Sequence, residues 1–218
     1  MKLSDLKKPS YVWGLVVMHL LGLNAFFIAF RAPIEASQGA AQKIFYWHVP
    51  SAMVMMLFFI IGGVASVAYL IKRSPKFDLL ASSFIEVGFL FCTIVLVTGP
   101  LWAKPIWGAW WTWETRLTST LFVWLIFFGY FILRSSLEDK DDARLYSAVL
   151  ALFGCLDVPI IMLAVRLWRG VHPQVLHARA NLPDEMWFVL IFSAVTVLML
   201  ASFFTYLRYK KEVLKLYG

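Results

Sequence analysis

The chain has 218 residues, of which 61% are hydrophobic and only 15% are charged. A soluble domain carries roughly a quarter charged residues. Because long apolar runs account for the deficit here, the composition indicates an integral membrane protein. The net charge of +7 does not by itself exclude any class of partner. Lys and Arg stand at the ends of apolar runs and form no basic face, so we expect no nucleic-acid partner.

Hydropathy predicts six membrane-spanning helices, each with the roughly 20 residues that a bilayer requires. In chain order they cover approximately residues 11–30, 45–71, 79–98, 117–133, 144–165 and 186–207. The expected fold is therefore an all-α integral membrane protein, a six-transmembrane-helix bundle that forms a single domain over residues 1–218. The connections at 31–44, 99–116 and 166–185 are irregular and rich in Trp, Pro, Gly and His, unlike the short charged ones.

Basic residues give the bundle an orientation, because cytoplasmic loops carry an excess of Lys and Arg. The termini and the two short connections hold Lys2, Lys7, Lys8, Lys72, Arg73, Lys76, Arg134, Lys140, Arg144, Arg208, Lys210, Lys211 and Lys215. The other loops hold only Arg31, Lys43, Lys104, Arg116, Arg166, Arg169 and Arg179. This asymmetry predicts that both termini are cytoplasmic and that the 99–116 loop faces outward.

Four tryptophans stand within seven residues in the stretch WGAWWTWETRLTS, which begins at Trp107. An interfacial belt of aromatic rings would populate both membrane surfaces. Eight of the ten tryptophans nevertheless fall on or near the predicted outer side, and only Trp13 and Trp124 lie toward the inner side. The asymmetry favours an additional task, a ligand site, for the outer loop.

If this stretch is a short interfacial helix, its spacing places Trp107, Trp110, Trp111 and Glu114 on one face. Such a shelf of rings suits a flat, apolar ligand, because stacked rings contribute beyond simple burial. Gly108 permits close approach, and Lys104 and Arg116 flank the shelf, where they can meet carboxylates. A porphyrin fits this description, and a quinone or a lipid could also use the shelf.

Three of the four histidines share the predicted outer side with the tryptophans. His48 is expected just ahead of the second helix, with Pro50 in the first turn of that helix. The positive end of the helix dipole disfavours a protonated imidazole there, and a metal requires the neutral form. His48 and either His172 or His177 could hold an iron from opposite sides. His19 is expected to be a packed residue of the first span.

These motifs resemble the tryptophan-rich WWD signature of the haem-handling superfamily in cytochrome c biogenesis. The likeness extends to VTGPLWAKPIWG, FYWHVPSAM and DVPIIMLAVRLWRGVHP, so that it covers about residues 43–207. Length and span number are similar to those of the haem exporter protein C family, the C component of system I cytochrome c maturation. One residue departs from the family pattern, because Glu114 stands where the family has Asp.

The resemblance implies a non-covalent haem b site whose axial ligands are His48 and His172, with His177 the weaker candidate. The WWD block carries over to Trp107, Gly108, Trp110, Trp111, Trp113, Glu114 and Arg116, beside Lys104. The charge of the family's acid is retained at Glu114, and its reach is one methylene longer. The chain has no C-x-x-C-H motif, so it does not itself attach haem covalently as a c-type cytochrome does.

The function implied is a haem relay in the cytoplasmic (inner) membrane, with the haem site on the periplasmic or outer side. Expected partners are haem, a membrane-anchored haem chaperone (the E component), the ABC-type A and B components and a small single-span D component. The protein makes no covalent bond, so we do not expect an enzyme. Buried acids at Glu86 and Asp157 motivate a rival, a proton-coupled secondary transporter. A second rival is a structural subunit that binds no haem.

Overall fold

The computed structural model describes residues 3–168 and 182–217, which fold almost entirely into helices. The elements are α1 (Leu3–Phe26) with a π-helical turn (Phe27–Arg31), a 3₁₀ turn (Ala40–Ile44), α2 (Phe45–Lys72), α3 (Pro75–Trp107), α4 (Thr115–Ser136), α5 (Lys140–Leu167) and α6 (Asp184–Tyr217). Within these described ranges, six helical segments are long and apolar enough to cross a membrane. The six-helix membrane bundle predicted from hydropathy is confirmed.

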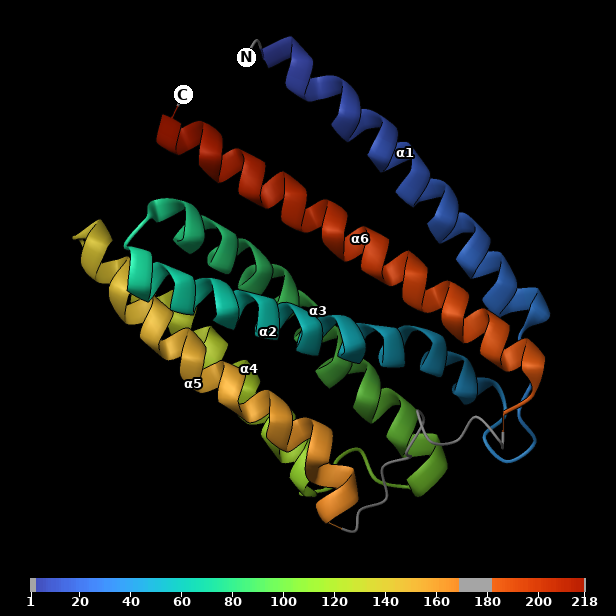
Figure 1. The fold of residues 1–218 in the computed structure, drawn as a ribbon. Coiled ribbons are helices and arrows are strands. Elements are labelled where there is room, and N and C mark those ends of the chain that lie inside the picture. Colours follow the sequence, from blue (N-terminus) through green and yellow to red (C-terminus); the bar gives the residue numbers. More distant parts are fainter. Residues whose placement is uncertain (1–2, 169–181, 218) are drawn as a thin grey trace.

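The helix ends that flank the irregular connections gather at one end of the bundle, at the lower right of Figure 1. We call this the aromatic end; α2, α4 and α6 begin there, and α3 and α5 end there. At the opposite, terminal end, α1 begins, α6 ends and two short turns join α2 to α3 and α4 to α5. The connections between helices therefore fall into two sets, one at each end of the bundle, as the sequence predicts.

The core is built on the interface between α2 and α3, which is the most extensive in the bundle. A Cβ atom on Gly62 would lie 2.7 Å from Ile85, and one on Gly88 would lie 2.9 Å from Phe59. Small residues at such points allow two helices to approach closely in a membrane. Phe59 also stacks on Phe127 of α4, with ring centroids 4.1 Å apart.

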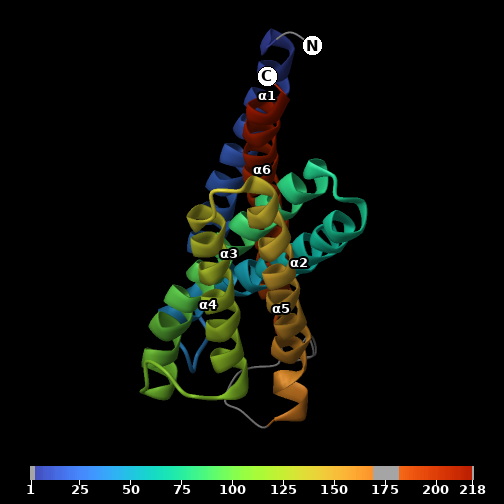
Figure 2. The same ribbon diagram turned by 90° about the vertical axis from the view of Figure 1, so that its left-hand side faces the viewer.

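The helices α4 and α5 lie side by side, which Figure 2 shows from the second direction. At the terminal end a buried carboxylate ties them to α3. Asp78 of α3 accepts hydrogen bonds from both terminal nitrogens of Arg134 of α4, at 2.7 and 2.6 Å. Arg144 of α5 approaches the same carboxylate at 3.6 Å. Three helices thus share one ion-pair cluster.

The structure corrects the expected loop at 99–116, because α3 continues to Trp107. Pro100 and Pro105 lie inside this helix. Each proline removes one backbone hydrogen bond, but the chain remains helical around both. Only residues 108–114 form the connection between α3 and α4. The first part of the tryptophan-rich segment is therefore held on a helix.

Candidate functional site

The tryptophan-rich run is divided at Gly108, where α3 ends. Gly108 has φ +74°, and its N–H donates to the carbonyl of Lys104 at 3.0 Å. This left-handed cap suits glycine because a Cβ atom is strained there. Residues 109–114 are not helical. The expected helical shelf of Trp107, Trp110, Trp111 and Glu114 is therefore wrong, since Trp107 alone of the four lies in the helix.

Lys104 closes the same turn from its side chain. Its Nζ atom donates to the carbonyl of Gly108 at 2.9 Å and lies 5.9 Å from the ring centre of Trp110. A cation over an indole face is attracted by the negative face of the ring. Lys104 thus fixes the turn and positions Trp110.

The tryptophans of the turn differ in exposure. Trp110 and Trp113 are 55% and 77% exposed, whereas Trp111 is half-buried. Trp111 and Trp113 meet edge to face, with ring centroids 5.9 Å apart. The ring N–H of Trp111 is buried, and no acceptor for it lies among the described residues. A nonpolar surface of indole rings is therefore presented at the aromatic end, with a buried donor beneath it.

Glu114 and Arg116 stand at the start of α4. Glu114 is the N-cap residue in extended conformation, and its carbonyl accepts from the N–H of Thr118 at 3.0 Å. Arg116 is partly buried, and its Nε atom donates to the carbonyl of Ile161 on α5 at 3.3 Å. The arginine therefore links the start of α4 to α5, beside the tryptophan-rich turn.

His48 lies in the second turn of α2, because the helix begins at Phe45. The expectation that His48 precedes the helix is therefore wrong, and Pro50 lies inside the helix rather than in its first turn. Preceding residues already form a 3₁₀ turn that runs directly into α2. The imidazole remains near the positive end of the helix dipole. It is buried, with 6% of the residue exposed.

The hydroxyl of Thr98 links the imidazole of His48 to the backbone of α3. Thr98 of α3 donates its only hydroxyl proton to the carbonyl of Ile94 at 2.7 Å. The Thr98 oxygen also lies 2.9 Å from Nδ1 of His48. Both contacts are satisfied together when Nδ1 donates and the hydroxyl accepts. This tautomer places the lone pair on Nε2, the arrangement found in a metal-ligating histidine.

The ring of His48 is also held from the side by α3. The ring of Trp102 meets the imidazole edge to face, with centroids 5.7 Å apart. The ring of Phe45 in turn meets that of Trp102 edge to face, with centroids 5.9 Å apart. A Cβ atom on Gly99 would lie 3.4 Å from Cε1 of the imidazole. Thr98 and Trp102 thus hold the ring from α3, and Gly99 leaves room beside its Cε1 atom.

The connection before α2 contributes to the same cluster. Gln38 accepts a hydrogen bond from Nε1 of Trp102 at 3.1 Å. Glu35 in turn accepts from the hydroxyl and N–H of Ser37 and from the N–H of Gln38. These bonds, that from the Ser37 hydroxyl first, hold the pKa of Glu35 below its usual value. A charged Glu35 therefore shapes the turn that presents Gln38 to Trp102.

Sequence reasoning found His48 and the tryptophans but missed the side chains that orient the histidine. Thr98 and Trp102 are four residues apart, so they share a face only if α3 continues past Thr98. The expected loop concealed that relation. The two remaining histidine candidates, His172 and His177, lie outside the described residues.

The comparison with known proteins identifies the chain's family. A family model described as heme exporter protein C matches residues 1–217. The chain belongs to the heme exporter protein C family. The match extends over both the aromatic end and the terminal end, and it agrees with the WWD resemblance of the tryptophan-rich segment.

Individual members of the heme exporter protein C family are similar over most of their length. The protein of that name from Bradyrhizobium diazoefficiens is 34% identical over 79% of this chain and 69% of its own length. That from Rhodobacter capsulatus is 31% identical over 94% and 81%. That from Escherichia coli strain K12 is 31% identical over 84% and 75%.

Proposed function

We propose that this chain, a haem-handling membrane protein of cytochrome c maturation, binds haem b without a covalent bond at the aromatic end and passes it on. The observation that supports the proposal is the 2.9 Å contact between Nδ1 of His48 and the Thr98 hydroxyl. With Nδ1 as the donor to Thr98, Nε2 is the nitrogen that would take the iron. The exposed rings of Trp110 and Trp113 supply a surface that suits a porphyrin face.

In this proposal the iron lies between two imidazoles. His48 is the first ligand and His172 the second, with His177 as the weaker candidate. Trp107, Gly108 and the tryptophans of the turn hold the ring, while Lys104 and Arg116 meet its propionates. Axial ligation by histidine without a thioether bond holds haem strongly enough to orient it and still allows release. Glu114 retains the charge of the family's Asp beside Arg116.

The same proposal assigns partners and location. The haem receiver is a membrane-anchored chaperone, the E component, and the ABC-type A and B components with the small D component drive and assist release. The chain lies in the cytoplasmic (inner) membrane with both termini inside, so that the aromatic end faces the periplasm. It transfers haem and catalyses no covalent step, so we do not class it as an enzyme.

A titration of the purified chain with hemin tests the site. Wild type should develop a Soret band, and acidified organic solvent should extract all of the haem. His48→Ala should lose most of that band because it removes the Nε2 ligand. His19→Ala is the matched control. His19 is exposed on α1, so the expectation of a packed residue is wrong, and its Nδ1 lies against the carbonyl of Leu15. A colourless wild-type protein would overturn the proposal in favour of a structural subunit.

Substitution of the two remaining histidines identifies the second ligand. His172→Ala should shift the Soret band or weaken haem retention, and His177→Ala should change little. The opposite pattern would assign the iron to His177.

The alternative of a proton-coupled transporter relies on the acids Glu86 and Asp157. Glu86 forms an ion pair with Arg208 toward the terminal end, which weakens its case as a proton carrier.

A further inference from the structure

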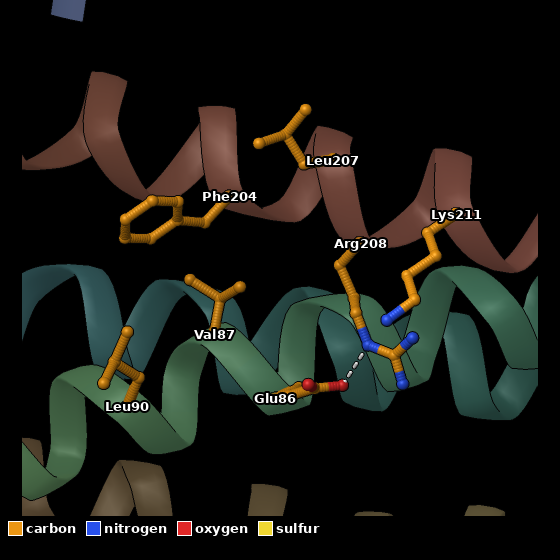
Figure 3. Close-up of a pocket in the computed structure, with 7 residues that line it drawn as sticks. All are labelled: Glu86, Val87, Leu90, Phe204, Leu207, Arg208 and Lys211. Carbon is orange, nitrogen blue, oxygen red and sulfur yellow. Dashed lines mark hydrogen bonds and ion pairs between the residues drawn. The ribbon is translucent and has the colours of Figure 1, made fainter. Parts of the chain in front are cut away.

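A groove of about 480 Å³ lies between α3 and α6, away from the aromatic end. Figure 3 shows the seven side chains that line it, with α6 above and α3 below. They are Glu86, Val87, Leu90, Phe204, Leu207, Arg208 and Lys211. All seven belong to membrane-spanning helices. None of them takes part in the proposed haem site.

The lining of the groove changes character along the bundle axis. Toward the middle of the bundle it is apolar, with Leu90 of α3 and Phe204 of α6 (Figure 3). Toward the terminal end it is charged, with Glu86, Arg208 and then Lys211. Phe204 and Lys211 are seven residues apart, or about 10 Å along the helix. An acyl chain and headgroup of a lipid in this leaflet are arranged in the same order.

The charges at the polar end leave a positive excess. Arg208 pairs with Glu86 and with Glu212, and Lys215 also pairs with Glu212. Lys211 forms no ion pair within the part of the chain that the structure describes. Three basic side chains thus stand against two carboxylates. The site is matched to an anion, and Arg208 is held in place by its two acidic neighbours.

We propose that this groove binds an acidic phospholipid of the leaflet at the terminal end. Its phosphate lies against Lys211 and Arg208, and one acyl chain lies along Leu90, Phe204 and Leu207. The half-exposed pair of Glu86 and Arg208 then meets a headgroup rather than hydrocarbon, which lessens the cost of charge at this depth. The proposal is independent of haem binding.

Native mass spectrometry of the purified chain with added lipid tests the site. Phosphatidylglycerol should be retained more strongly than phosphatidylcholine with the same acyl chains. Lys211→Gln should reduce retention of phosphatidylglycerol about five-fold, the effect of one basic residue near a membrane surface, and leave phosphatidylcholine unchanged. Lys72→Gln is the matched control, because Lys72 lies at the same end, over the ring of Phe77 and outside the groove.

The apolar half of the groove needs a separate variant. Leu90→Trp should fill it and reduce retention of both lipids, whereas Leu125→Trp on α4 should not. Leu90 and Leu125 are similarly exposed, at 44% and 47%, so both variants should fold.

Four results would overturn the proposal. Equal losses in Lys211→Gln and Lys72→Gln would mean diffuse surface attraction. Equal retention of the two lipids, or no effect of Leu90→Trp, would exclude a built site. A co-purified polypeptide that prevents added phosphatidylglycerol from binding would assign the groove to a partner helix instead.

Discussion

The hydroxyl of Thr98 connects His48 to α3. It donates to a carbonyl of its own helix, and its oxygen can then accept from Nδ1 of the imidazole. Trp102 packs against the ring, and Gln38 holds Trp102 in turn. The imidazole is therefore positioned by side chains of α3 and of the connection before α2, before any ligand is bound.

Replacing the hydroxyl tests this positioning directly. Thr98→Val keeps the shape but removes the acceptor, so that Nδ1–H of His48 is buried without its partner. Because such partners tune metal ligands, haem affinity should fall about ten-fold. Thr98→Ser keeps the hydroxyl and should bind as wild type. Hemin titration followed at the Soret band measures both, and equal affinity of the Val variant and wild type would contradict the assigned role.

Sequence analysis could identify His48 as a candidate but could not find its supports. Thr98 is 50 residues away and meets the histidine only through the packing of α2 against α3. Gln38 and Trp102 are 64 residues apart and belong to different segments. Residue type and spacing carry no information about such contacts. The chemical identity of the tryptophans and histidines was visible, whereas their mutual geometry required the fold.

At the scale of the helices, α3 differs most from expectation. The sequence analysis places Pro100 and Pro105 in an irregular connection, and proline disfavours the interior of a soluble helix. In a membrane protein, neighbouring helices can support such positions, and α3 passes through both. The helix ends at Gly108 instead. Hydropathy therefore predicted the existence of the helix correctly, and the predicted end at residue 98 fell short of the observed end at Trp107.

The cap at Gly108 gives a prediction for the stability of this helix end. Gly108→Ala should destabilise the protein by about 1–2 kcal/mol, because a left-handed backbone strains a residue with a Cβ atom. Steric crowding is not the cause, since no described residue beyond the chain neighbours has an atom within 4 Å of that Cβ position. Gly129→Ala in α4 meets equally open space at an ordinary helical position, and it should stabilise by about 0.5–1 kcal/mol.

Thermal unfolding in detergent measures both variants. A lower Tm for Gly108→Ala together with an unchanged or higher Tm for Gly129→Ala is expected. If the two variants shift Tm alike, the left-handed cap does not determine the effect. Hemin binding by Gly108→Ala should also weaken, since the turn carries Trp110 and Trp111.

For the whole molecule, the terminal end is held together by Asp78. Its carboxylate is 4% exposed and contacts arginines of two other helices. Asp78→Asn would leave two partly buried guanidinium groups without their shared counter-charge, so we expect a loss of about 3–5 kcal/mol. Asp141→Asn is the control, because this carboxylate pairs with the same Arg144 but is 86% exposed. It should change stability by less than about 1 kcal/mol. Equal Tm shifts in thermal unfolding would contradict the cluster's role.

The division of the connections between two ends also predicts how the molecule lies in its membrane. The terminal end carries most of the Lys and Arg, and such loops remain in the cytoplasm. A cysteine at Pro33, exposed at the aromatic end, should therefore react with a membrane-impermeant maleimide added to spheroplasts. A cysteine at Glu138, exposed at the terminal end, should react only after the membrane is permeabilised.

The parent chain is the control, since its own Cys92 is buried and Cys155 lies partly buried within a membrane span. Labelling of Glu138→Cys but not Pro33→Cys in intact spheroplasts would reverse the orientation. The proposed haem site would then face the cytoplasm, where it could not supply a periplasmic chaperone.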